Sequence, residues 1–215
     1  MKKAIIFGTG IFAETLVYYL GESEIYGFTV ERGFRTSDEY MGLPLVDFDN
    51  VEKVFSTDEY GLYICLGYTS MNTERERIFG IAQEKGFDIL SYIHPTASVN
   101  AKSMGIGNIV LEKSIIGPFC EIGNGNIFKA GSSIAHHTHV GNFNFFAVSC
   151  SVAGSVKIGN NCFIGNNCTI KNGIKISDCT LAGAGCYISK DTESYGVYVP
   201  ERSIRLEGKK STDFF

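Results

Sequence analysis

The sequence lacks an apolar stretch long enough to cross a bilayer, and it carries little excess charge of either sign. A membrane-spanning helix needs about 20 consecutive apolar residues, so we expect no membrane insertion. The net charge is −4, from 19 Lys and Arg against 23 Asp and Glu. This mildly acidic balance argues against nucleic acid as a partner, because surfaces that bind nucleic acid are basic.

Signals for secretion and for metal binding are also missing. The apolar run that follows Lys2 and Lys3 is interrupted at Gly8 and Gly10, which is too early for a signal peptide. The seven cysteines include no Cys-x-x-Cys pair, a spacing typical of zinc sites. We therefore expect a cytoplasmic protein with small buried thiols and no bound metal.

What the sequence does contain is a six-residue repeat whose phase never slips. Every sixth residue is apolar: Val110, Ile116, Ile122, Phe128, Ile134, Val140, Phe146, Val152, Ile158, Ile164, Ile170, Ile176, Ala182 and Ile188. Helices repeat at 3.6 residues and strands at 2.0, so neither period alone explains this register. A hexapeptide repeat predicts a parallel β-helix, in which three short flat faces close one triangular coil and the coils stack.

A second track, two positions before each apolar residue, is mostly small. It reads Ser114, Cys120, Asn126, Ser132, Thr138, Asn144, Cys150, Val156, Cys162, Cys168, Ile174, Thr180 and Cys186. These residues suit a narrow interior, and they include five of the seven cysteines. Glycine often follows the apolar residue, as at Gly123 and Gly141, and we expect a positive φ or a close backbone approach there. The next residue is often asparagine, which tolerates left-handed geometry.

The first 93 residues follow a different pattern. Lys3–Gly8 reads as a buried strand, Ile11–Leu20 as a helix and Ile25–Val30 as a second strand. The turn Gly8-Thr9-Gly10 joins the first strand to the helix, whose free N–H groups would face an anion. Glu31 follows about twenty residues later, as a ribose-binding acid does. The alternative for this turn is tight packing in an α/β domain.

Further along, the pattern predicts a strand over 61–67, a charged helix over 73–85 and a last strand over 87–93. The loop 68–72 comes at the carboxyl end of a strand, where ligands bind in open α/β sheets. His94-Pro95 then separates this part of the chain from the repeat. Because the flat faces and the open end of a β-helix need cover, we expect a symmetric oligomer.

A short GxG-containing α/β unit followed by hexapeptide repeats resembles the sugar acyltransferases typified by PglD and NeuD. The resemblance spans the chain to about Val199 and is sharpest at 132–136 and 153–165. It implies an α/β plus β fold: a Rossmann-like nucleotide-sugar-binding domain (1–93), a left-handed parallel β-helix (94–190) and a C-terminal tail (191–215). It also implies a homotrimer that moves an acyl group, most often acetyl, from acyl-CoA to an amino group of a nucleotide-linked amino sugar.

The resemblance also implies roles for particular residues. His136 matches the family's catalytic base, and a neutral imidazole is suited to take a proton from an attacking amine. The oxyanion and CoA contacts would come from Gly154, Ala147, Asn166, Ala182 and Gly183. The nucleotide-sugar would contact Gly8, Thr9, Gly10, Glu31, Arg32, Gly67, Tyr68 and Asn72.

The sequence departs from the family at three places. His137 stands where many members have Asp or Glu, and it cannot act as a carboxylate orienter. Phe145 stands where a second histidine contacts the thioester, which makes the site more apolar and is compatible with a different acyl group or base-orienting partner, or with lost activity. Val199-Pro200-Glu201-Arg202 replaces the usual Gly-x-Pro-Ala ending.

Three other functions compete with the N-acyltransferase. They are a sugar O-acetyltransferase, a non-catalytic nucleotide-sugar-binding scaffold and a zinc hydro-lyase resembling γ-type carbonic anhydrases. The hydro-lyase needs three convergent histidines, whereas adjacent extended residues point to opposite sides. By the same argument we expect His137 and His139 to point away from His136.

Overall fold

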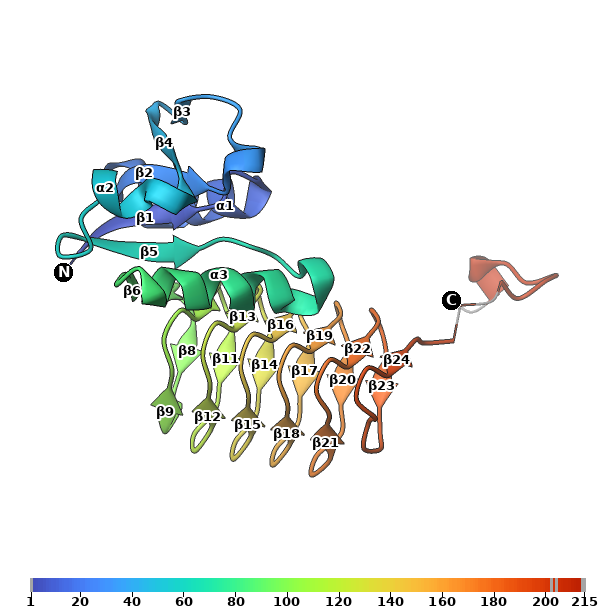
Figure 1. The fold of residues 1–215 in the computed structure, drawn as a ribbon. Helices are drawn as coiled ribbons and strands as arrows, with labels where there is room; N and C mark the ends of the chain where they lie inside the picture. The colour runs from blue at the N-terminus through green and yellow to red at the C-terminus, as the bar shows by residue number, and fades with distance from the viewer. Residues whose placement is uncertain (1, 202, 204, 214–215) are drawn as a thin grey trace.

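In the computed structural model, which describes residues 2–201, 203 and 205–213, an α/β domain packs on a left-handed parallel β-helix (Figure 1). The α/β sheet has the strand order β3-β4-β2-β1-β5-β6, parallel except for the β3–β4 pair. Its strands are β1 (Lys3–Phe7), β2 (Ile25–Val30), β3 (Glu39–Tyr40), β4 (Leu43–Asp47), β5 (Tyr60–Ile64) and β6 (Asp88–Ile89). Its helices are α1 (Ile11–Leu20), α2 (Val51–Val54) and α3 (Thr73–Glu84). The expected strand–turn–helix–strand start of the chain is confirmed.

The β-helix has three faces, which we number in chain order. Face 1 holds β7 (Tyr92–Ile93), β10 (Ile109–Val110), β13 (Ile127–Phe128), β16 (Phe145–Phe146), β19 (Phe163–Ile164), β22 (Leu181–Ala182) and β24 (Val197–Tyr198). Face 2 holds β8 (Ser98–Val99), β11 (Ile115–Ile116), β14 (Ser133–Ile134), β17 (Ser151–Val152), β20 (Thr169–Ile170) and β23 (Tyr187–Ile188). Face 3 holds β9 (Ser103–Met104), β12 (Glu121–Ile122), β15 (His139–Val140), β18 (Lys157–Ile158) and β21 (Lys175–Ile176).

The interior of the β-helix is the predicted apolar column. All fourteen residues of the six-residue track from Val110 to Ile188 are buried in one cluster. Equivalent residues stack across coils, as Phe128 does on Phe146 with ring centroids 4.8 Å apart and planes at 2°. The small-residue track also points inward, and the Oδ1 atoms of Asn108 and Asn126 accept the N–H groups of Asn126 and Asn144, each at 2.9 Å. The period-six interpretation of the sequence is therefore confirmed.

The corner geometry differs in one respect from the expectation. Positive φ angles occur three residues after each inward residue from Val110 to Ala182, for example at Phe119 (62°) and His137 (56°), and not at the glycines that directly follow the inward residues. Those glycines serve close approach instead, because a Cβ on Gly123 would lie 2.6 Å from the carbonyl oxygen of Gly141. The asparagines are not left-handed either; Asn142 Oδ1 accepts the N–H of Asn124 at 2.8 Å and so ties successive coils together.

The α/β domain covers face 1 from β7 to β19, while β22 and β24 lie beyond it (Figure 1). The outward residues of face 1 are apolar, and Ile109, Ile127 and Phe145 are buried in the cluster that also holds Leu16 and Val17 of α1. At the edge between faces 1 and 2, Tyr19 of α1 donates to Glu112 at 2.7 Å. At the edge between faces 3 and 1, Arg75 of α3 donates from Nε to the carbonyl of Gly125 at 2.9 Å. Only the edge between faces 2 and 3 is free of α/β-domain contacts among the described residues.

Two boundaries differ from the sequence-based expectations. The strand expected over 87–93 is two strands: β6 ends the α/β sheet, and β7 begins face 1 of the β-helix. The repeat also continues beyond Ile188, since β24 pairs with β22. No helix in the described part of the chain is long and apolar enough to cross a bilayer.

Candidate functional site

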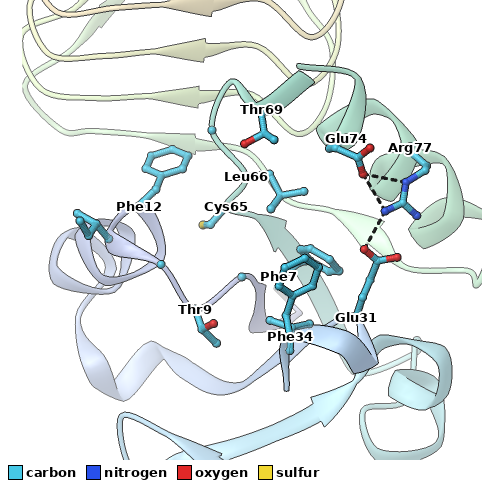
Figure 2. A pocket seen from close by; sticks show the side chains of 15 residues that line it. Phe7, Thr9, Phe12, Glu31, Phe34, Cys65, Leu66, Thr69, Glu74 and Arg77 are labelled. Carbon is cyan, nitrogen blue, oxygen red and sulfur yellow. Dashed lines mark hydrogen bonds and ion pairs between the residues drawn. The ribbon is translucent and has the colours of Figure 1, made fainter. Parts of the chain in front are cut away.

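A pocket of about 460 Å³ opens at the carboxyl ends of β1 and β5 (Figure 2). Five of the residues predicted to bind nucleotide-sugar line it: Gly8, Thr9, Gly10, Glu31 and Gly67. The parallel order of β2, β1 and β5 brings these loops together, because the carboxyl ends of parallel strands meet at one side of the sheet. We call this space the domain pocket.

The glycine turn has a physical reason at Gly8. Its φ is 116°, and a Cβ there would lie 3.0 Å from the carbonyl oxygen of Cys65, so both strain and crowding exclude a side chain. Gly10 caps the N-terminus of α1 with extended backbone, and its Cβ position is open. Ile11 and Phe12, the first residues of the helix, line the pocket. Their end of the helix is suited to an anion such as a phosphate.

The acidic residue of the pocket is not a free acceptor. Glu31 lies 2.8 Å from Nη2 of Arg77, which also lies 2.9 Å from Glu74 (Figure 2). Hydrogen bonds to these two carboxylates raise the pKa of Arg77. A ribose hydroxyl would therefore meet an acid–base pair that offers both acceptors and donors. Sequence reasoning missed Phe12, Phe34, Glu74 and Arg77 as lining residues. Phe12 follows the glycine turn on α1, whereas only the packing of α3 and the turn after β2 brings the other three to the pocket.

Arg32, Tyr68 and Asn72, also predicted to contact the nucleotide-sugar, lie outside the domain pocket. Arg32 lines a separate shallow cleft with Arg35 and Asp38. Asn72 is fully buried, and its Nδ2 donates to the carbonyl of Cys162 at 3.1 Å, so it anchors the loop to the β-helix. Tyr68 faces the edge between faces 1 and 2.

Tyr68 covers a second, smaller pocket of about 230 Å³ at that edge, which we call the edge pocket. Its ring makes edge contacts with Phe145 and Phe163, whose rings stack at 5.5 Å and 10°. Ala147 and Asn166, predicted to contact CoA, also line it. Phe145 is thus an outward residue of face 1 beneath the α/β domain, and it is only 7% exposed.

Lys129 is a site residue that sequence reasoning missed. It lines the edge pocket, and its Nζ lies 4.7 Å from the centroid of the Phe12 ring, which lines the domain pocket. Burial lowers the pKa of Lys129. The side chain therefore stands between the two pockets as a partly desolvated cation. Its position one residue after an inward phenylalanine, where most repeats have Gly or Ala, was the available signal.

His136 and Gly154 lie elsewhere, at the edge between faces 2 and 3. The His136 ring packs over Gly154 of the next coil, and a Cβ on Gly154 would lie 2.6 Å from Cε1 and 2.9 Å from Nε2 of His136. The Gly154 N–H makes no hydrogen bond within the part of the chain that the structure describes. An imidazole beside an unused N–H is an arrangement of base and oxyanion donor.

The predicted orientation of His137 is wrong. We expected an extended backbone that turns it away from His136, but a corner intervenes and His137 has a φ of 56°. The two rings meet, with Nδ1 of His136 3.1 Å from Nδ1 of His137. His139 does point elsewhere, onto face 3, where its Nε2 lies 3.2 Å from Glu121. No cluster of three metal-ligating residues occurs among the described residues.

Two of the residues predicted to contact CoA are placed differently from the rest. Ala182 is a fully buried member of the interior column and cannot present its side chain to a ligand. The Gly183 N–H donates to the carbonyl of Tyr198 at 2.8 Å, which closes the last coil. Of the remaining predicted CoA and oxyanion residues, Gly154 lies at the edge between faces 2 and 3, whereas Ala147 and Asn166 lie at the edge between faces 1 and 2. The whole of face 2 separates these two edges.

Comparisons with known proteins agree with this architecture. The sequence profile described as Bacterial transferase hexapeptide (six repeats) matches residues 137–172. No curated protein sequence matches the chain. Among solved structures, the acetyltransferase domain of PglB from Neisseria gonorrhoeae, in complex with acetyl coenzyme A, is 20% identical, with a TM-score of 0.78 over 89% of this chain and 93% of that one.

Two further structures are similar over nearly the whole chain. A mutant of perosamine N-acetyltransferase from Caulobacter crescentus, in complex with CoA and GDP-perosamine, is 22% identical, with a TM-score of 0.81 over 92% of this chain and 93% of that one. WeeI from Acinetobacter baumannii is 16% identical, with a TM-score of 0.79 over 92% of this chain and 96% of that one. At these identities the likeness establishes the fold.

Proposed function

We propose that this chain, a hexapeptide-repeat protein with the two-domain fold of the PglB and perosamine acetyltransferases, is an acyl-CoA-dependent N-acyltransferase. Its donor is acetyl-CoA, and its acceptor is the amino group of a nucleotide-linked amino sugar. Both solved relatives are described with acetyl-CoA or CoA bound, and one with a nucleotide-linked amino sugar. The seven free cysteines suit a reducing compartment, so a cytoplasmic location belongs to the proposal.

The observation that carries the proposal is the pairing of His136 with Gly154. In the reaction, the neutral amine nitrogen attacks the thioester carbonyl carbon, and Nε2 of His136 takes the proton that the nitrogen loses. The carbonyl oxygen becomes an oxyanion, which the Gly154 N–H stabilises by donating a hydrogen bond. The tetrahedral intermediate then collapses, the C–S bond breaks, and the CoA thiolate receives the proton from His136.

The proposal includes a second copy of the chain in each site. Lys129 and the edge pocket lie at the edge between faces 1 and 2, and Phe12 of the domain pocket lies beside Lys129, whereas His136 lies at the edge between faces 2 and 3. Because face 2 separates these edges, one copy cannot bring them together. In a homotrimer with parallel β-helices, the edge between faces 1 and 2 of one copy lies against the edge between faces 2 and 3 of its neighbour. Acyl-CoA would lie in the groove between these two edges.

The direct test is acyl transfer by the purified protein. It is incubated with acetyl-CoA and a panel of nucleotide-linked amino sugars, and mass spectrometry follows the gain of an acetyl group on the sugar. The same panel with a hydroxyl in place of the amine tests the O-acetyltransferase alternative. Binding of the sugar without transfer from any acyl-CoA would favour the scaffold alternative.

Mixed oligomers test whether two copies build the site. His136→Ala removes the base, and Gly10→Trp fills the domain pocket at a position where the backbone has room for a side chain. In a mixed oligomer, some sites combine the intact His136 of a Gly10→Trp copy with the intact domain pocket of a His136→Ala copy. At a sugar concentration well below the KM of Gly10→Trp, mixed oligomers should therefore be more active than either variant alone. Absence of any gain, with light scattering showing three times the chain mass of 23.5 kDa, would place the site within one copy.

A further inference from the structure

The two neighbouring histidines of the 2–3 edge form a contact pair. Nδ1 of His136 lies 3.1 Å from Nδ1 of His137, and the ring planes meet at 84°. That distance is a hydrogen bond, which requires one Nδ1 to carry a proton and the other to present a lone pair. The corner makes the contact possible, because the left-handed backbone of His137 turns its side chain back toward its neighbour.

We propose that His137 is a positioning residue for the base: its Nδ1 accepts the Nδ1–H of His136 and so keeps the lone pair of His136 on Nε2. The inference deepens the proposed function and rests on it. It gives His137 the orienting task that a carboxylate performs in triads of the Ser-His-Asp kind. A neutral imidazole is a weaker acceptor than a carboxylate, but its lone pair satisfies the same donor.

The direction of the hydrogen bond follows from what each ring touches. The His136 ring packs over Gly154, the oxyanion donor, where a Cβ would lie 2.6 Å from Cε1, 2.9 Å from Nε2 and 3.0 Å from Nδ1. The His137 ring instead stacks on Phe119 of the preceding corner, with centroids 4.7 Å apart and planes at 30°. The His137 N–H donates to the carbonyl of Pro118 at 3.1 Å. His136 therefore faces the reacting groups, and His137 is held behind it.

Few charged groups compete for the pair. The adjoining corners present Pro118 and Phe119 on one side and Gly154 and Ser155 on the other, none of which titrates near neutral pH. On face 3, Glu121 is engaged by Lys102 at 2.7 Å and by His139 at 3.2 Å. Lys157 follows His139 in the same outward column, and Lys171 lies one coil beyond Ala153. Among the described residues, none of these charged groups forms an ion pair with His136 or His137.

The proton transfers of the proposed reaction leave the hydrogen bond between His136 and His137 intact. When Nε2 of His136 takes the amine proton, His136 becomes an imidazolium whose Nδ1–H is still bonded to neutral His137. That bond stabilises the charged form, and a variant that lacks the acceptor at position 137 loses this stabilisation. The proton then leaves Nε2 for the CoA thiolate, and His137 never changes its own protonation state.

The test compares three substitutions at position 137 in the full-length protein. His137→Phe keeps a planar ring for the stack on Phe119 and removes the acceptor. The chain itself carries phenylalanine at two equivalent left-handed corners, Phe119 and Phe143, so the backbone tolerates it. His137→Asn keeps an acceptor and suits the left-handed backbone. His137→Glu introduces the stronger, charged acceptor.

We expect His137→Phe to lower kcat about 10-fold or more with little change in either KM, the scale on which residues that orient an active group act. The inflection of the pH–rate profile should move to lower pH in His137→Phe and to higher pH in His137→Glu, with His137→Asn between wild type and His137→Phe. A purely structural role would lower the melting temperature without this ordered shift. Unchanged kcat and an unchanged inflection in His137→Phe would overturn the proposal.

A readout that needs no turnover separates this inference from the proposed function. The chain has four histidines, so their imidazole NMR signals can be assigned by substituting them one at a time. In wild type, His136 should carry its proton on Nδ1, and its titration should move to lower pH in His137→Phe. If no protein transfers acetyl groups but this shift appears, the proposed function fails and the pair stands. If transfer is found and His136 titrates identically in both proteins, the pair fails and the function stands.

Discussion

The imidazole of His136 lies so close to Gly154 of the next coil that a single added carbon would displace it. A Cβ on Gly154 would lie 2.6 Å from Cε1 of His136 and 3.0 Å from Nδ1. We therefore expect Gly154→Ala to push the ring aside and to lower kcat by about 10-fold or more, since small misplacements of reacting groups reduce rates to this extent. Gly80→Ala, on α3 with nothing within 4 Å of the new carbon, is the matched control. Full activity of Gly154→Ala would mean that the ring has another productive position.

Removal of the base itself should have a larger effect. His136→Ala and His136→Asn should each lower kcat at least about 10²-fold, the usual contribution of a general base, with little change in KM. The measurement is steady-state kinetics with acetyl-CoA and the sugar identified in the panel. His139→Ala, on face 3, is the control and should retain activity. A fully active His136→Ala would show that the amine arrives neutral without help from this side chain.

The domain pocket can be filled without straining the backbone. Gly10 has extended φ and ψ angles and open space around its Cβ position, whereas Gly8 has a positive φ and a crowded Cβ position. We expect Gly10→Trp to raise the KM for the nucleotide-sugar at least about 10-fold, because the indole occupies the ligand's volume, and to leave the KM for acetyl-CoA nearly unchanged. An unaltered sugar KM would remove the domain pocket from the site.

Arg75 joins the two domains and should be important for stability. It is 2% exposed and donates to the carbonyls of Gly125 and Phe143 in the β-helix and of Leu66 and Gly67 in the α/β domain. Burial lowers its pKa to about 9, so it is still charged at neutral pH. Each buried acceptor left without its donor costs about 1–3 kcal/mol. Arg75→Met leaves several such acceptors, so it should lower the free energy of unfolding by the sum of their costs.

Chemical denaturation gives that free energy directly. Arg77→Met, on the same helix but with its guanidinium exposed and paired at the surface, is the matched control and should change stability by no more than about 1 kcal/mol. Equal effects of the two substitutions would contradict the domain-joining role of Arg75.

The hydrogen bond from Tyr19 to Glu112 should make stability depend on high pH. The bond to Glu112 raises the pKa of Tyr19 from 10.0 to about 12. A folded-state pKa above the unfolded one means that the stabilisation is complete below about pH 10 and is lost as the pH rises toward 12. Tyr19→Phe lacks this contribution, so wild type should exceed it in stability at pH 8 and approach it at pH 12. If wild type and Tyr19→Phe differed in free energy of unfolding by the same amount at pH 8 and at pH 12, the linkage would be contradicted.

The sequence by itself determined the β-helix and most of the start of the α/β domain. A six-residue apolar period with no slip is compatible with one arrangement of short flat faces, so it specifies every inward side chain from Val110 to Ile188. The turn Gly8-Thr9-Gly10 is likewise a local signal, because the strain at Gly8 excludes other residues. These features depend on residues close together in the chain, and pattern reasoning can follow them.

The tertiary structure decided how those parts form a candidate site. Corner backbone, not strand alternation, turned His137 onto His136, and only the stacking of Phe119 and the left-handed φ reveal it. Packing of the α/β domain on face 1 buried Phe145 under Tyr68 and left the 2–3 edge with His136 open. These outcomes depend on contacts between residues tens of positions apart, and a period of six contains no information about which face a neighbouring domain covers.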